Sequence, residues 1–456
     1  MASQKQIFLK KSKIAFDKNH RKTIKHNMSQ YDNAVKKGKQ RYLDIERAKE
    51  RASFVKSKVM NNLPDYLEEF EKNIVSRGSE VLWAKNSKEA IDHITHVFEN
   101  SKAKLLVKSK SMISEEIELN DYSEKAGVEP VETDLGEFIV QTANEKPYHI
   151  LTPAMHKSKH DVAKLFHEKF DTPENATPEE LTQYVRGVLR KKFTSAEIGV
   201  TGANFLVADV GGVALVENEG NGLMSVSFPK NHIVITGIEK VIPSINDLPL
   251  FLPLLSSIGT GQQVTVYNSL LLGPKQKGET FGPEKMVVVL IDNSCSEIYK
   301  EETHRDVLKC IRCGACLNAC PIYKNVGGYT YNTEYTGPIG SVITPFMKGF
   351  DDFSHLSYAC TVCGRCTEVC PVKIPLHNLL LLNRKKAVEK KLQPIFWEVG
   401  MKAYKFAFEK RARLDAVKGA TKNTVLKCGL NLLGKNKKNP QFADQSFSRQ
   451  SKNKNK

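Results

Sequence analysis

The stretch CIRCGACLNACP, from Cys310 to Pro321, is followed by a second copy of the same pattern, CTVCGRCTEVCP, from Cys360 to Pro371. Both copies have the spacing C-x2-C-x2-C-x3-C-P, and together they contain eight of the ten cysteines in the 456-residue chain. Cysteines that recur at short, regular intervals in a chain without a secretory signal point to bound metal rather than to disulfides. The repeat therefore predicts a metal-binding domain late in the chain.

The spacing is the one that ferredoxin-type [4Fe-4S] sites use. Three cysteines two residues apart can reach three irons of one cubane, whereas the fourth, followed by proline, leaves in another direction. In two-cluster ferredoxins this fourth cysteine ligates the other cluster. The sequence therefore predicts two [4Fe-4S] clusters that exchange ligands. One set is Cys310, Cys313, Cys316 and Cys370, and the other is Cys360, Cys363, Cys366 and Cys320.

Zinc is the alternative metal, because four thiolates also bind zinc. Zinc sites usually pair two short C-x2-4-C units, which the triple spacing does not match. Gly314 and Gly364 would let the backbone approach the inorganic sulfides of a cluster closely. Four basic residues beside the ligands either raise the cluster potentials, meet a partner or are plain surface charges: Lys309, Arg312, Arg365 and Lys373.

Charge is distributed unevenly along the chain, whose formal net charge is +17. Residues 1–58 have 17 Lys/Arg and 5 Asp/Glu, residues 384–456 have 20 and 5, and residues 59–383 are acidic, at −10. A nucleic-acid-binding protein needs a basic stripe on its folded domain, so no nucleic-acid partner is expected. The basic ends could dock an acidic partner or make peripheral contact with anionic lipid, but solvated helical arms are the simpler interpretation.

No apolar run reaches the ~18 to 20 residues of a transmembrane segment. The first residues, MASQKQIFLKKSKIAF, lack the apolar stretch of a secretory signal. We therefore expect a cytoplasmic protein. The sequence has neither a GxGxxG after a first strand nor a GKS/GKT loop, so nothing indicates a nicotinamide or nucleoside-triphosphate site. The sequence leaves the question of a flavin cofactor open.

Alternating strand and helix patterns before the cysteines predict an α/β domain with parallel strands. The expected strands lie at residues 80–83, 103–110, 136–143, 147–153, 232–242 and 284–292, with glycine turns and hairpins after residue 204. Five segments are expected: a basic helical extension at 1–60, the α/β domain at 61–294, a mainly α-helical two-cluster domain at 295–400, a basic helical region at 401–433 and a disordered tail at 434–456.

The join between the α/β domain and the cysteine repeat resembles the LutB/LldF family of lactate-utilisation iron–sulfur proteins. The segments VKSKSMISEEIELN, GVTGANFLVADVGGVALVENEGN and PLFLPLLSSIGTGQQVTVYNSLLLGPK are similar to the LUD domain of that family. The resemblance implies a fold related to the sugar-isomerase and CoA-transferase folds. It also implies an iron–sulfur subunit of a complex that oxidises L-lactate to pyruvate, with two further subunits and an electron acceptor as partners.

Two rival functions stay open. The chain could be the cluster subunit of another dehydrogenase or quinone-linked complex, or a binding protein whose clusters are structural. The catalytic residues are unknown, and whether this chain alone is an enzyme is undecided.

Several weaker signals lie in the α/β domain. The turn Lys108-Ser109-Lys110-Ser111 could hold a carboxylate such as lactate, or it could simply cap the next helix. The loop at residues 256–262 could form an anion nest or be an ordinary loop. Three acidic residues are either acid–base groups or solvated hairpin ends: Asp209, Glu217 and Glu219. His156 and His160 have the spacing of metal ligands on a helix but lack a third ligand nearby.

Overall fold

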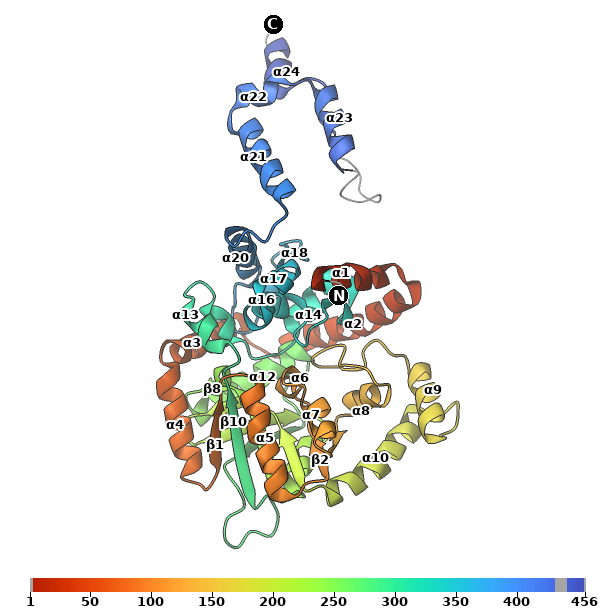
Figure 1. The fold of residues 1–456 in the computed structure, drawn as a ribbon, viewed down its shortest axis with the longest axis vertical. Coiled ribbons are helices and arrows are strands. Elements are labelled where there is room, and N and C mark those ends of the chain that lie inside the picture. Colours follow the sequence, from red (N-terminus) through yellow and green to blue (C-terminus); the bar gives the residue numbers. More distant parts are fainter. Residues whose placement is uncertain (1–2, 431–440, 455–456) are drawn as a thin grey trace. The chain divides into compact units, whose positions relative to one another are not determined.

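The computed structural model describes residues 3–430 and 441–454 (Figure 1). The chain divides into two compact units, residues 1–386 and 387–456, which we describe separately. The first unit contains the α/β domain and both cysteine stretches, and it therefore contains every predicted ligand.

A six-stranded parallel sheet forms the centre of the α/β domain. Its order is β1-β10-β7-β4-β2-β3. The strands are β1 (Glu80–Ala84), β10 (Lys285–Ile291), β7 (Asn231–Gly237), β4 (Ile198–Thr201), β2 (Leu105–Lys108) and β3 (Glu129–Glu132). Continuous apolar runs such as that of β10 are expected where a parallel sheet is covered on both faces. The parallel α/β architecture predicted from the sequence is confirmed.

Helices cover both faces of this sheet. On one face Val287, Val289 and Ile291 of β10 belong to a core shared with α5 (Ser87–Ser101), α6 (Met112–Glu116) and α7 (Leu119–Lys125). The opposite face has α4, α8, α9, α10 and α12, which span Leu63–Val75, Leu135–Thr142, Lys159–Phe170, Pro178–Ser195 and Leu248–Gly259. Alternate side chains of each strand thus enter different cores, as the strand period of two requires.

A second, smaller sheet packs into the core on that opposite face. Its order is β8-β5-β6-β9, over Val241–Ile242, Phe205–Val207, Gly212–Glu217 and Tyr267–Leu271. Strands β5 and β6 form the predicted hairpin, and Gly211 at its turn has φ +58°. An α11 helix (Asn221–Ser227) follows instead of a further strand.

The region after β10 is helical in the residues described up to 386. Its elements are α13 (Cys295–Lys300), η4 (Arg305–Lys309), α14 (Ala315–Ala319), α15 (Pro321–Val326), η5 (Tyr329–Tyr331), α16 (Gly337–Lys348), α17 (Phe350–Phe353), α18 (His355–Tyr358), α19 (Arg365–Glu368) and the start of α20 (Leu376–Glu389). In Figure 1 this region lies beyond the carboxyl ends of the parallel strands.

The N-terminal extension is helical, as predicted, but it is not a solvated arm. It consists of α1 (Gln4–Lys11), η1 (Ser12–Phe16), α2 (Lys18–Lys39) and α3 (Ile45–Asn61). Helix α2 packs against α12 and α15, and α3 packs against η4 and α12. Ile24, Met28 and Val59 are fully or almost fully buried in the main core. The solvated-arm interpretation rested on the many lysines of this segment and gave too little weight to the apolar residues at helical spacing, which pack into the core.

The second unit contains α21 (Ile395–Glu409), α22 (Arg411–Ala416), α23 (Gly419–Leu430) and α24 (Phe447–Lys454). Part of the tail predicted to be disordered lies outside the described residues, which omit 431–440 and 455–456, and α24 lies in the remainder. No helix in the described part of the chain is long and apolar enough to cross a membrane.

Two predicted strands are wrong. Residues 136–143 fall mainly in helix α8, whose first turn is capped by the Asp134 carboxylate, which accepts from the Glu137 N–H at 3.1 Å. Residues 147–153 form a loop in which the His149 ring accepts from the Leu151 N–H. Short apolar runs do not distinguish a strand from a buried helix turn, which is the reason for the first error.

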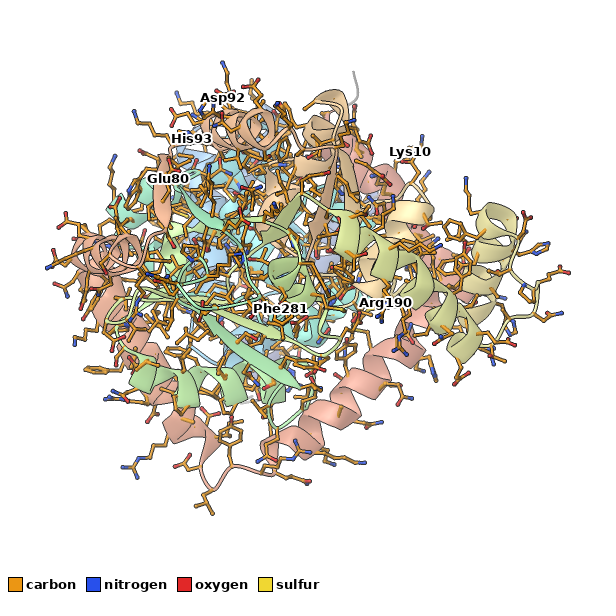
Figure 2. The ribbon with its side chains drawn as sticks, turned by 90° about the horizontal axis from the view of Figure 1, so that it is seen from below. Lys10, Glu80, Asp92, His93, Arg190 and Phe281 are labelled. Carbon is orange, nitrogen blue, oxygen red and sulfur yellow. The ribbon has the colours of Figure 1, made fainter. Side chains whose placement is uncertain are left out.

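Figure 2 shows the molecule from below, toward the amino-terminal ends of the strands, where Glu80 begins β1 and Phe281 precedes β10. Phe281 is 77% exposed. The residues that follow the carboxyl ends of β2, β4 and β7 lie at the other edge of the sheet, nearer the helical region. In parallel α/β sheets ligands bind at that carboxyl edge.

A close contact between β4 and α11 gives a test of the fold. A Cβ on Gly199 would lie 1.7 Å from the Ser225 carbonyl oxygen, whereas a Cβ on Gly187, in α10, would meet nothing within 4 Å. We expect Gly199→Ala to destabilise the protein by at least about 2 kcal/mol through overpacking. Gly187→Ala is the control and should stabilise it by about 1 kcal/mol. Anaerobic denaturant unfolding measures both, and equal stability of Gly199→Ala and the parent would contradict this packing.

Candidate functional site

The two cysteine stretches have the same backbone conformation. Arg312 and Gly314 have φ of +57° and +72°, and the matching residues Val362 and Gly364 have +56° and +79°. A left-handed conformation is rare for a β-branched residue such as Val362, so its occurrence at the same place in both loops indicates a shared constraint. In each loop the N–H of this residue donates to the sulfur two positions earlier, at 3.4 and 3.3 Å. The loops fold around their cysteine sulfurs.

The first set of predicted ligands surrounds one small cavity, lined by Cys310, Cys313, Cys316 and Cys370. All four are free cysteines. Burial raises the pKa of Cys370 to about 11, and burial followed by the neighbouring thiolates raises the pKa of Cys316 well above its usual range. Four thiolates this close need a compensating positive charge, and bound metal supplies one.

The second set brings Cys320 together with cysteines of the other stretch. Burial raises the pKa of Cys320, and the thiolates of Cys360 and Cys363 raise it further. The pKa of Cys366 rises to about 12, again through burial first and then through Cys360 and Cys320. Cys363 is exposed, so this set lies nearer to solvent than the first. Each set thus combines three cysteines of one stretch with the last cysteine of the other.

These residues fit iron–sulfur clusters. Backbone N–H groups donate to Cys320 and Cys370 sulfurs at 3.5 and 3.4 Å, as they do to the first cysteine of each loop. Such N–H···S bonds stabilise the negative charge of a cluster. In the described part of the chain no three His, Cys, Asp or Glu side chains are grouped to hold a single metal ion. In a cubane each thiolate instead binds its own iron.

Buried cations from helix α3 stand beside the first set. The Lys56 ammonium is 1% exposed and donates to the carbonyls of Glu239 and Val241 at 2.6 and 3.1 Å. Burial lowers the pKa of Lys56 to about 7, and Cys310 is among the charges that act on it. Lys49, also buried, donates to the Glu368 carbonyl at 2.9 Å. These cations would raise the potential of a negatively charged cluster.

Sequence reasoning missed these two lysines, although a signal was present. Lys49, Ala52, Lys56 and Val59 follow one another at helical intervals, which places both lysines on the buried face of α3. The four basic residues beside the ligands divide into two kinds. Lys309 and the side chain of Arg312 are largely buried, whereas the Arg365 and Lys373 side chains are more exposed and pair with nearby glutamates.

A cavity of about 350 Å³ lies at the carboxyl ends of β2, β4 and β7. Its lining includes Ser109 to Ser111 after β2, Gly202 to Asn204 after β4, and Thr236, Gly237, Glu239 and Lys240 at the end of and just after β7. Arg312 and Ile150 line both this cavity and the small cysteine cavity. The larger cavity therefore adjoins the first set of cysteines.

Several of the weak sequence signals meet at this cavity. Ser109, Lys110 and Ser111 line it, although Ser111 also caps α6. Residues of the 256–262 stretch line it too, as do Glu217 and Glu219. Residues 256–259 belong to the end of helix α12, so only the rest of that stretch is a loop. Other predicted residues do not reach it. Lys108 is buried against Glu115 and Glu132, and Asp209 accepts from the Ile245 N–H.

The histidine pair does not form a metal site. His156 is 2.7 Å from a Glu145 carboxylate oxygen, and its ring stacks on Tyr148. His160 lies in the first turn of α9, whereas His156 precedes that helix, so the two histidines do not lie on one helix face. Cys295 is a half-buried free thiol, and the side chain of Cys428 lies outside the described part of the chain.

Comparison with known proteins gives matches to both domains. The chain matches the LUD domain family over residues 67–291 and the 4Fe-4S dicluster domain family over residues 306–374. "Lactate utilization protein B" of Bacillus velezensis is 44% identical over 77% of this chain and 74% of its own length, and that of Bacillus subtilis is 45% identical over 77% and 73%. "Uncharacterized electron transport protein YkgF" of Escherichia coli is 40% identical over 78% of each chain.

A matched pair of variants tests the crosswise ligand sets. Replacing Cys310, Cys313 and Cys316 together with Cys370 by serine removes one complete set, so the second cluster should remain, with about four irons per chain. Replacing the same three together with Cys320 also takes a ligand from the second set, so less iron should remain. Iron and acid-labile sulfide are counted after anaerobic purification. The reverse order of iron contents would show that each stretch binds its own cluster.

A second prediction concerns the buried cation of α3. We expect Lys56→Met to lower the midpoint potential of one cluster by tens of millivolts, because a positive charge near Cys310 is lost. Lys58→Met is the control, since Lys58 is exposed on the same helix. Redox titration followed by EPR measures both variants. Equal potentials in the parent and in Lys56→Met would contradict the electrostatic role of Lys56.

Proposed function

This chain belongs to the family of LUD-domain 4Fe-4S proteins that includes lactate utilization protein B, and from that premise we propose that it is the iron–sulfur electron-transfer subunit of a complex that oxidises L-lactate to pyruvate. The observation that carries the proposal is the pairing of two four-cysteine sets across two stretches of sequence. That arrangement suits a relay, because it holds two redox centres close together.

Oxidation of a 2-hydroxy acid releases two electrons, and each bound [4Fe-4S] cluster would carry one. A buried tyrosine lies close to cysteines of both sets. Tyr331 is 2% exposed, and the charges that act on it include Cys316, Cys320 and Cys360, which come from both sets. Tyr323 is fully buried beside it and donates to the Tyr148 carbonyl at 3.0 Å. Helices α14 and α19, which begin directly after Gly314 and Gly364 of the two loops, contact each other.

The two sets differ in their surroundings, which supports different roles. The first adjoins the α/β cavity and the buried lysines of α3. The second includes the exposed Cys363, so we assign it to electron exchange with another protein. We further propose two additional subunits, an electron acceptor and a cytoplasmic location. The exposed aromatic residues of α21, among them Trp397 and Phe406, and the basic charge of the second unit support a docking or peripheral membrane contact there.

The domain boundaries follow from the same premise. The matched ranges, 67–291 and 306–374, lie inside the segments 61–294 and 295–400 that we propose as the LUD domain and the two-cluster domain. The remaining segments are the helical extension at 1–60, the helical region at 401–433 and the tail at 434–456.

Growth on L-lactate tests the proposed function. We expect a strain that lacks the gene to lose growth on L-lactate while it keeps growth on glucose, because electrons from lactate no longer reach their acceptor. The wild-type gene should restore growth, and a gene with Cys313→Ser and Cys363→Ser should not. Normal growth of the deletion strain on L-lactate would leave the rival, a cluster subunit of another dehydrogenase, as the better account. Restoration by the cysteine variant would argue against electron transfer.

A further inference from the structure

The 350 Å³ cavity has a size within the ~300 to 1,000 Å³ of small-molecule sites. Charged groups line it in two places. Asp134, Glu217, Glu219 and Lys110 lie on one side, and Glu239, Lys240 and Arg312 lie together beside the first cysteine set. The two places differ in whether their charges are already satisfied.

The acidic side is satisfied within the protein. Glu217 and Glu219 accept backbone N–H bonds of 2.5 to 3.2 Å, and Asp134 accepts one at 3.1 Å. Lys110 lies 3.5 Å from Asp134 and donates to the Leu151 carbonyl at 3.1 Å. These carboxylates already have hydrogen-bond donors, and their remaining negative charge disfavours an anionic ligand on this side of the cavity.

The side next to the cysteines has cationic groups without partners. Nη2 of Arg312 lies 3.4 Å from a Glu239 oxygen, but its Nε and Nη1 are buried and have no partner among the described residues. Lys240 lines the cavity, and none of the described residues gives its ammonium a hydrogen bond or an ion pair. Glu239, Glu116 and Cys310 are negative groups that act on both cations. They nevertheless leave Nε and Nη1 of Arg312 without hydrogen bonds, so unpartnered cationic donors line this side of the cavity.

A buried hydroxyl lies near the same end of β7. Thr236 is 1% exposed and lines the cavity, and its Oγ1 has no partner among the described residues. Leaving a buried hydroxyl without a hydrogen bond is unfavourable. The guanidinium of Arg312 is held in place by the Tyr335 ring, 4.4 Å away. Arg312, Lys240 and Thr236 thus all line this cavity, and Arg312 and Thr236 bring unpartnered polar atoms to it.

We propose that this cavity binds a small carboxylate of the 2-hydroxy or 2-oxo acid class, with its carboxylate on Lys240 and Arg312 and Thr236 as a further hydrogen-bond partner. A planar guanidinium fork and an ammonium are the groups that recognise a carboxylate. The choice of acid rests on the proposed function, whereas the binding of a carboxylate rests on the side chains. Because Arg312 stands between Cys310 and Cys313, the bound acid lies beside the first cysteine set.

Direct binding tests this proposal on the full chain, purified without oxygen and with its iron content verified. Calorimetric titration with L-lactate and with pyruvate should show binding of at least one acid, and neutral lactamide should show none. Lys240→Gln should weaken the binding about 10- to 100-fold, which corresponds to the loss of a hydrogen bond from a charged group. Lys230→Gln is the control, because the Lys230 side chain is 76% exposed and Lys230 precedes β7, whereas Lys240 follows the opposite end of that strand.

Thr236→Val separates ligand binding from folding. Valine has nearly the shape of threonine, and the hydroxyl that it removes has no partner among the described residues, so the melting temperature should stay equal or rise. Binding of the acid should nevertheless weaken several-fold. A lower melting temperature with unchanged binding would assign Thr236 to folding and overturn its part in the site.

Three results would overturn the proposal: no binding of either acid, equal binding by Lys240→Gln and the parent, or inorganic phosphate binding as tightly as the acids. The outcome is separable from that of the growth test. If the chain binds the acid but the deletion strain grows on L-lactate, the cavity assignment holds and the lactate function fails. If the chain binds no acid but growth is lost, the function holds and the acid binds elsewhere in the complex.

Discussion

The grouping of each fourth cysteine with the three cysteines of the other stretch is the constraint on which the helical region depends. Cys320 and Cys370 must each leave their own loop and reach the opposite one, so the chain between them has to return on itself. Helices α15 to α18 form the connection that returns the chain, and Tyr323 and Tyr331 in this connection are almost fully buried. The left-handed residues Arg312 and Val362 give both loops the same curvature. The fold of this region therefore holds the two cysteine sets together.

The α/β domain and the helical region share one core rather than meeting at a flat interface. Apolar residues of β10, α12, α14 and α16 belong to the same cluster, and a Cβ on Gly259 of α12 would come within 2.9 Å of the Cys313 carbonyl oxygen. Helices α2 and α3 pack at this junction, and α3 brings Lys49 and Lys56 to it. The basic charge of the N-terminal extension is therefore partly a structural feature of the cluster environment. The cavity at the carboxyl edge of the sheet adjoins the same junction, because Arg312 lines both this cavity and the small cysteine cavity.

The sequence predicted the elements whose chemistry depends on local spacing. The cysteine pattern indicated the ligand sets, and long apolar runs such as residues 284–292 indicated parallel strands. It failed where tertiary contacts decide. Residues 136–143 are apolar enough for a strand, yet they form a helix capped by Asp134. The lysines of α3 look like surface charges until the helix is packed. Ser109, Glu217 and Lys240 are far apart in the chain, and only the fold shows that they line one cavity.

The central claim is that two [4Fe-4S] clusters lie close together because each takes its fourth cysteine from the stretch that binds the other. EPR of the fully reduced, anaerobically purified chain tests it most directly, together with a metal count. The account predicts about eight irons per chain and a spectrum broadened or split by coupling between two reduced clusters, which returns to a simple signal when only one is reduced. Two independent, uncoupled signals at full reduction, or a colourless protein that contains zinc, would contradict it.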